Sequence, residues 1–418
     1  MKFSNFGRKV AALVSTLALG AGLSSCGSGT IGYLYVLGTL TNSGTFGQIS
    51  GFKIDDRTGN LTNMVNSPYT SGGVNPGNAV VFPGGRFLYV LNKGTSTAGT
   101  VNACPVNTGA SVAEYLVGGD GVLTYQGSYY SQGVNPQWLS LDSSGRYLYV
   151  IDQVNPTCST KPAGTSVTGD ITVFGVATDT GRLTTIMNTG LGSNNPPPYF
   201  EVGYKPSMLR VVGSYVYTLD TGDESIFIYN ASTAGQLVKA ASYTTGTIGT
   251  NITSIGGNTS GSYIYLTDAG TNMLYIYTVG SSGALSSLTL GNTALPSVTS
   301  NPVWTMASQN GKFLYVVSQG NSTNPTVVQS AITAYSILST GVLELVSDTS
   351  NPYPTGAGSV CMVQDPTNQY VYVSNHNDST VTGYALNANT GQLSSLTRTT
   401  VFPISGQASC LVVSGYTS

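Results

Sequence analysis

Residue types that carry out acid–base chemistry are scarce in this chain. Among 418 residues there is one histidine, His376, and charged residues make up 8% of the sequence. Asp152, Asp220 and Asp268 each follow a copy of one apolar strand pattern. Hydrolysis at a carbonyl group needs a base that activates water and a donor that stabilises the developing oxyanion. His376 and these carboxylates are the candidate bases, while a solvated loop histidine and turn-capping aspartates are the structural alternatives.

Arg210 is the candidate donor. It lies inside a predicted strand in which the equivalent positions of other repeats carry Val80, Ser140 or Met306. A charge at such a position must face solvent or find a partner. It therefore either contacts a ligand or forms a structural ion pair with Glu201, Asp220 or Asp268.

Trp138 and Trp304 are the only tryptophans, and each follows an X-Pro pair closely. They could stack on a sugar, or they could pack between structural repeats. No phosphate-binding loop, hydrolase elbow or zinc-protease motif occurs. There is no CxxC pair, and His376 is not near a cysteine in sequence, so we expect no metal and no cofactor.

Three patterns each occur seven times, 48 to 68 residues apart, and position these candidates. The first is a strand with two apolar faces, aromatic–aliphatic–Tyr–aliphatic with one Thr variant, which begins at Tyr33, Phe87, Tyr147, Tyr215, Tyr263, Phe313 and Tyr370. The second is aliphatic-x-x-aromatic-x-aliphatic (or Ala), which begins at Ile49, Val112, Ile171, Ile226, Leu274, Ile332 and Val381. The third is a Gly-x-Leu hairpin at Gly59, Gly121, Gly181, Gly235, Gly283, Gly341 and Gly391. Such periods indicate a propeller.

The repeats predict an all-β, seven-bladed β-propeller with four-stranded antiparallel blades. The first repeat lacks its innermost strand, and the chain finishes with an unpartnered strand of that type at 408–413. We therefore expect the C-terminal strand to complete the N-terminal blade and to close the ring, which removes exposed sheet edges. Residues 31–418 form this one domain.

The N-terminus predicts export. In residues 1–25, Lys2, Arg8 and Lys9 precede an apolar stretch, and Cys26 follows Leu23-Ser24-Ser25. This order resembles a bacterial lipoprotein signal peptide, in which the cysteine is lipidated and becomes the new N-terminus. We expect a lipid-anchored protein on the periplasmic side or the surface of the outer membrane, with residues 26–30 as a tether. An ordinary signal peptide with a coincidental cysteine is the alternative.

Four other cysteines would lie in an oxidising compartment. Cys361 and Cys410 occupy matching positions on the innermost strands of adjacent blades, and Cys104 and Cys158 lie in the two longest loops between second and third strands. We predict the disulfides Cys104–Cys158 and Cys361–Cys410; four free thiols are the alternative. The formal net charge of −2 and the absence of a basic patch argue against a nucleic-acid partner.

The segments Asp142-Ser-Ser-Gly-Arg-Tyr-Leu-Tyr-Val-Ile-Asp152 and Asp179-Thr-Gly-Arg-Leu183 resemble the lactonase-type seven-bladed propellers, the family of the propeller 6-phosphogluconolactonases. The resemblance implies a lactone hydrolase. However, the family's enzymes carry a Gly-Pro-Arg-His segment at the start of an inner strand. The corresponding segments here, which begin at Asn75, Asn135, Lys205 and Asn301, contain no histidine.

The sequence is consistent with two alternative functions. The scarcity of catalytic residue types favours a binding or scaffold module that uses its channel rim for a small polar molecule, a glycan or an envelope protein. The family resemblance favours a metal-independent lactone hydrolase that uses Arg210, Asp220, Asp268 or His376.

Overall fold

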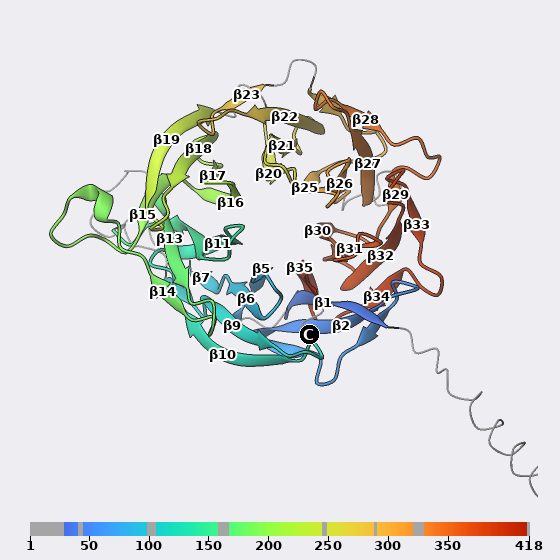
Figure 1. Cartoon of the computed structure of the whole chain (residues 1–418), viewed down its shortest axis with the longest axis horizontal. Coiled ribbons are helices and arrows are strands. Elements are labelled where there is room, and N and C mark those ends of the chain that lie inside the picture. Colours follow the sequence, from blue (N-terminus) through green and yellow to red (C-terminus); the bar gives the residue numbers. More distant parts are fainter. Residues whose placement is uncertain are drawn as a thin grey trace, which may run out of the picture.

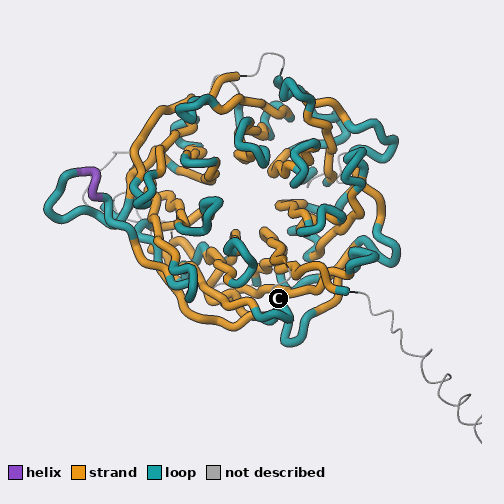
Figure 2. The backbone as a smooth tube through the Cα atoms, viewed as in Figure 1, coloured by secondary structure: helices purple, strands orange, loops and turns teal. Residues whose placement is uncertain are grey.

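The computed structural model describes residues 29–40, 45–97, 106–157, 167–244, 249–287, 291–320 and 330–415. Within these ranges, seven antiparallel sheets stand in a ring around a central axis (Figures 1 and 2). The predicted seven-bladed propeller is confirmed. The described residues contain one helix, the 3-10 turn η2 (Thr189–Leu191), and no helix in them is both long and apolar enough to cross a bilayer.

Each blade runs outwards from the axis through four strands, here called a, b, c and d. The a strands are β35 (Gln407–Gly415), β5 (Pro76–Val81), β11 (Val134–Leu141), β16 (Pro206–Val212), β20 (Ile252–Gly257), β25 (Pro302–Ala307) and β30 (Ser359–Gln364) in blades 1 to 7. The b strands are β1 (Thr30–Thr39), β6 (Phe87–Asn92), β12 (Tyr147–Val154), β17 (Tyr215–Asp220), β21 (Tyr263–Asp268), β26 (Phe313–Ser318) and β31 (Tyr370–Asn375).

The outer two strands of each blade complete the sheet. The c strands are β2 (Phe46–Asp55), β9 (Ser111–Val117), β13 (Thr168–Val176), β18 (Ser225–Ala231), β22 (Met273–Val279), β27 (Ala331–Ile337) and β32 (Thr380–Leu386). The d strands are β3 (Leu61–Asn63), β10 (Leu123–Tyr129), β14 (Leu183–Thr185), β19 (Leu237–Thr244), β23 (Leu285–Ser287), β28 (Leu343–Leu345) and β33 (Leu393–Ser395).

Five blades have one strand more than the repeat pattern predicts. In each of them the segment between strand d and the next inner strand turns back and pairs with strand c. These strands are β4 (Tyr69–Val74), β15 (Phe200–Tyr204), β24 (Thr293–Ala294), β29 (Tyr353–Pro354) and β34 (Val401–Pro403). A separate hairpin, β7 (Thr95–Thr97) with β8 (Val106–Thr108), extends the b–c loop of blade 2.

The ring closes as the sequence predicts. The C-terminal strand β35 pairs antiparallel with the N-terminal strand β1, with Tyr35 opposite Val412. Blade 1 therefore takes its inner strand from one end of the chain and its other strands from the opposite end, and the inner edge of β1 is covered by β35.

The junctions between blades explain why the aromatic strand and the glycine hairpin recur together. At all seven junctions the ring that begins strand b packs against the hairpin glycine of the next blade, as Tyr215 does against Gly283. A Cβ on Gly283 would lie 2.5 Å from the Tyr215 ring, and φ there is +77°, so only glycine fits. The second aromatic of the strand adds a hydrogen bond: the Tyr217 hydroxyl donates to the Gly283 carbonyl at 2.8 Å.

Strands a and b define the two ends of the channel. The b–c and d–a loops lie at one end, called here the loop rim, and the a–b turns and c–d hairpins lie at the other, called the turn rim. Four inner strands begin at the loop rim with a residue of positive φ before proline, namely Asn75, Asn135, Lys205 and Asn301. Asparagine tolerates this left-handed conformation, which explains the recurrent Asn-Pro pairs.

Candidate functional site

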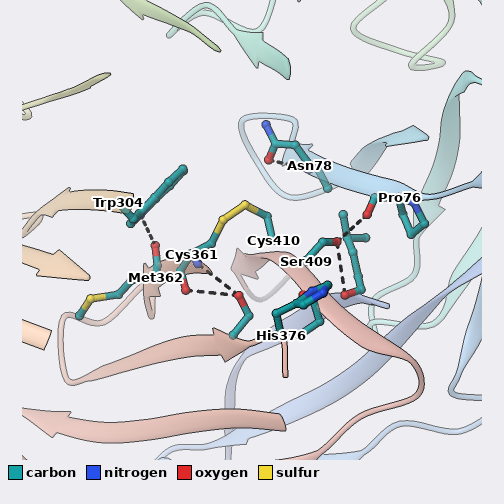
Figure 3. The surroundings of a disulfide bond; sticks show 12 residues. Pro76, Asn78, Trp304, Cys361, Met362, His376, Ser409 and Cys410 are labelled. Carbon is teal, nitrogen blue, oxygen red and sulfur yellow. Dashed lines mark hydrogen bonds between the residues drawn. A yellow bond between two sulfur atoms is a disulfide. The ribbon is translucent and has the colours of Figure 1, made fainter. Parts of the chain in front are cut away.

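The two tryptophans meet across the central channel. Trp138 on β11 of blade 3 and Trp304 on β25 of blade 6 come from opposite sides of the ring, and their ring centroids lie 5.5 Å apart. The Trp304 indole N–H donates to the Met362 carbonyl at 3.1 Å (Figure 3). The structure therefore places both side chains inside the channel, where they pack on each other, rather than separately on the rim.

His376 lies on the loop-rim side of this pair, in the turn after β31. Its side chain is half-buried, and its Nδ1 lies 2.7 Å from the carbonyl oxygen of Ala408 on β35. A carbonyl only accepts, so Nδ1 carries the proton, and in the neutral ring Nε2 keeps its lone pair. His376 thus joins blade 7 to blade 1 beside the Cys361–Cys410 disulfide (Figure 3).

The equivalent positions in other blades behave differently. Gln153 lies near the end of β12, and Gln319 directly follows β26. Each accepts a hydrogen bond from an asparagine of its own blade, Asn135 at 2.6 Å and Asn301 at 2.8 Å. Blade 7 has Gly358 in place of that asparagine. His376 is therefore free to reach the next blade.

Asp268 is a turn-capping aspartate, the structural alternative that the sequence analysis left open. Its carboxylate accepts hydrogen bonds from the Thr271 hydroxyl and from the backbone amides of Thr250, Asn251 and Gly270, at 2.6 to 3.0 Å. Burial raises its pKa, but these four donors outweigh that effect and lower it overall. Asp268 holds the two loops at its strand end together.

Asp152 belongs to a buried acidic cluster that the sequence analysis did not find. It lies directly across the sheet from Asp170 on β13, which in turn lies across from Glu201 on β15. Asp152 and Asp170 are fully buried, and among the described residues one hydrogen bond reaches their carboxylates, from the Ser131 hydroxyl to Asp152 at 2.7 Å. Alignment of the seven repeats could have revealed this cluster, because the other blades have Gln, Ser, Met, Ala or Thr at the position of Asp170.

Burial controls the ionisation of this cluster. It raises the pKa of Asp152 to about 7. It also raises the pKa of Asp170, and the negative charges of Asp152 and Glu201 raise it further. In the described part of the chain, no three His, Cys, Asp or Glu side chains meet in a way that could hold a metal ion.

Asp220 occupies the position in blade 4 that Asp152 occupies in blade 3, and it is also buried. Neither of its oxygens has a hydrogen-bond partner within the described ranges, and burial raises its pKa to about 7. Gly203 lies against it, since a Cβ there would be 2.3 Å from the Asp220 Oδ2. Asp220, like Asp152, is enclosed by protein and does not face the channel mouth.

Arg210 lies on the opposite side of the tryptophan pair from His376. It is four residues into β16, opposite Tyr217, whereas Asp220 is opposite Pro206 at the start of the strand. It lines a chamber of about 480 Å³ with residues from all seven a strands. None of the described residues forms an ion pair or hydrogen bond with Arg210, so the predicted partners Glu201, Asp220 and Asp268 do not pair with it.

The cysteines are described in part. Cys361 on β30 and Cys410 on β35 form the predicted disulfide, with Cα atoms 5.1 Å apart. Cys104 and Cys158, and the N-terminal region with Cys26, lie outside the described residues.

These features define a lactonase-type propeller. A family model described as lactonase, 7-bladed β-propeller matches residues 34–150, 107–294 and 267–409. The matches together span most of the chain, so this protein belongs to the lactonase seven-bladed β-propeller family. No curated protein matches the chain in sequence.

Several solved structures share the fold. The periplasmic gluconolactonase PpgL of Pseudomonas aeruginosa is 18% identical, with a TM-score of 0.66 over 93% of this chain and 100% of that one. A putative 6-phosphogluconolactonase of Bacteroides fragilis is 16% identical, with a TM-score of 0.65 over 92% of this chain and 98% of that one. One from Bacteroides uniformis is 15% identical, with a TM-score of 0.68 over 92% and 100%. At these identities the likeness concerns the fold.

Proposed function

We propose that this protein is an exported, lipid-anchored lactone hydrolase in which His376 is the general base. Membership of the lactonase family and the two kinds of gluconolactonase among the similar structures support the reaction class. One observation carries the assignment of the base: the Ala408 carbonyl holds Nδ1 of His376 at 2.7 Å and leaves Nε2 as an acceptor.

The reaction balances with one base and one water. Nε2 takes a proton from water, and the water oxygen attacks the lactone carbonyl carbon. The carbonyl oxygen becomes an oxyanion. When the carbonyl re-forms, the ring C–O bond breaks, and the imidazolium returns the proton to the departing ring oxygen. The product is a hydroxy acid, which releases its own carboxylic proton to solution.

The buried aspartates do not fit this role. A base must reach the water it activates, and Asp152 and Asp220 are fully buried while Asp268 is occupied by four donors. His376 is the remaining candidate base of the loop rim. Its half-buried imidazole presents an acceptor nitrogen that a water molecule can reach.

A lactone panel assayed with the purified protein tests the proposal. Glucono-δ-lactone, its 6-phosphate and a simple aliphatic lactone are the probes, because the names of the similar structures point to the first two. We expect turnover above the spontaneous rate for at least one probe, and a loss of about 100-fold or more in H376Q. Turnover of none of these probes above the blank would overturn the proposal.

Export is part of the same proposal. A buried disulfide between Cys361 and Cys410 is typical of an oxidising compartment, and this supports secretion. Lipidation of Cys26 rests on the N-terminal sequence pattern. A diacylglyceryl group together with an N-acyl chain would hold the protein firmly on the membrane.

A binding or scaffold role is the second candidate function. The position of Arg210 favours a binding role. Its charge has no ion-pair partner among the described residues, and it lies in a chamber whose described lining has no carboxylate. An envelope glycan or protein at the loop rim would belong to the same alternative. Retention of such a partner with no lactone turnover would favour it over the hydrolase.

A further inference from the structure

The turn-rim side of the channel is a chamber with walls on all sides. Its volume is about 480 Å³, and each of the seven a strands contributes to its lining. Trp304 and Met362 lie at its inner end, and Thr259, Gln309 and Gln364 lie at the turn rim. The chamber is therefore a cup that opens on the face opposite to His376.

The lining combines aliphatic side chains with a few polar ones and a single charge. Val80, Leu141, Met306, Val363 and Val412 are typical of it, and among the described lining residues Arg210 is the only charged one. Solvent reaches Arg210 through the channel, and the surrounding protein lowers its pKa because it desolvates the charge. A guanidinium in such surroundings remains charged, so it favours an anion.

A pair of glycines makes room beside Arg210. Gly256 and Gly257 occupy the end of β20 in the next blade, where other a strands carry side chains. A Cβ on Gly256 would lie 1.9 Å from the Thr305 hydroxyl oxygen, so no larger residue fits there. Thr305 lines the same chamber, but its hydroxyl is buried against Gly256 and has no hydrogen-bond partner among the described residues.

Two further polar side chains of the lining are engaged in hydrogen bonds. The Gln309 amide nitrogen donates to the Asp365 carbonyl at 2.8 Å, and the Gln364 side-chain oxygen accepts from the Gln309 backbone at 2.9 Å. Among the described lining residues, Arg210 is the one charged group that can meet a ligand. Its planar guanidinium can donate two parallel hydrogen bonds to the two oxygens of a single carboxylate.

We propose that this chamber binds a small organic monocarboxylate with an apolar body. The carboxylate would lie on Arg210, and the apolar body would lie along the valines and Met306 towards Trp304. A phosphate dianion fits less well, since the described lining offers no second cation. The site goes beyond the proposed hydrolase and does not depend on it, because His376 lies at the loop rim and does not line this chamber.

Intrinsic fluorescence reports on this chamber directly, because the only two tryptophans of the protein are in the channel. The probes are octanoate and benzoate, with octanol, benzyl alcohol and inorganic phosphate as comparisons. Isothermal titration calorimetry with the same probes measures binding independently of fluorescence.

The variants are R210M and R210K. R146Q is the matched control, since Arg146 is exposed on a turn-rim loop outside the chamber.

We expect saturable binding of at least one carboxylate to the wild type and R146Q. Binding should weaken by at least about tenfold in R210M and less in R210K, and circular dichroism should show that both variants fold. Absence of binding by both methods would overturn the proposal, as would equal affinity in R210M. Phosphate or an alcohol that binds as tightly as the carboxylates would overturn the assigned ligand class.

Discussion

The indole rings of Trp138 and Trp304 meet at 5.5 Å inside the channel, although the two residues belong to blades 3 and 6. Most blade contacts run around the ring, from one blade to the next. This contact runs across it. His376 lies at the loop rim, whereas Arg210 lies in the chamber towards the turn rim. The candidate residues of this propeller therefore fall into two sites, and a third group of carboxylates lies buried between the blades.

A double-mutant cycle tests the tryptophan contact. We expect W138L and W304L each to lower the free energy of unfolding, and the pair to show a coupling of about 1 kcal/mol. Urea unfolding followed by circular dichroism measures this without relying on tryptophan emission. Additive single effects would show that the rings do not stabilise each other.

The raised pKa of Asp220 predicts a pH-dependent stability. The folded value is about 7, whereas an unfolded Asp titrates near 3.9. Between those pH values the folded protein binds more protons, so this group makes stability fall as pH rises from about 4 to 7. We expect D220N to be more stable than the wild type at pH 8 by about 1–3 kcal/mol, with the gain smaller at pH 5.

Asp268 is the matched control, because its pKa is shifted the other way. Although burial raises it, the four hydrogen bonds lower it overall, so Asp268 stabilises the fold at neutral pH and this contribution is lost in acid. D268N should therefore be less stable than the wild type at pH 8. If D220N is also destabilised at pH 8, burial does not dominate the ionisation of Asp220.

The Cys361–Cys410 disulfide should contribute to the stability of the closed ring. The cysteines are 49 residues apart, and closing a loop of this length in the unfolded chain corresponds to about 2–4 kcal/mol. We expect the C361A/C410A double variant to lose about that much free energy of unfolding. A reductant should destabilise the wild type and leave the double variant unchanged; an equal response in both would contradict this account.

Replacement of Cys26 tests the anchor. C26S should move the protein from the membrane fraction to the soluble periplasmic or extracellular fraction, and metabolic labelling with a fatty acid should be lost. C361A/C410A in the same expression system should keep the label, because neither cysteine is near the N-terminus. Labelling of C26S at the wild-type level would contradict lipidation at this residue.

The sequence was sufficient to predict the blades because the same contacts recur. The packing of Tyr215 on Gly283 repeats at seven junctions, so every repeat carries both residue types. The a strand of blade 1 was predictable because only one strand was missing and only one was left over. The fifth strands, such as β15, were not predicted, because their pairing with strand c depends on loops that differ from blade to blade.

The sites were less predictable because they depend on contacts made once. Trp138 meets Trp304 only in the closed ring, and His376 finds Ala408 only because Gly358 replaces the asparagine present in other blades. Arg210 appeared as a candidate in the sequence, but the lack of any ion pair could be seen only once the channel was built. Asp170 was missed because it lies on a c strand and does not follow one of the aromatic b strands. Its importance becomes visible only when the sheet places it opposite Asp152.

The hydrolysis of glucono-δ-lactone and its 6-phosphate, followed by acid release in a pH-stat, tests the central claim most directly. We expect the wild type to exceed the spontaneous rate on one of them, H376Q to fall to that rate, and Q319A to retain activity. Gln319 is a suitable control, since it occupies the corresponding turn of blade 6 and bonds only within its own blade. Equal rates for H376Q and the wild type would contradict the assignment of His376 as the base.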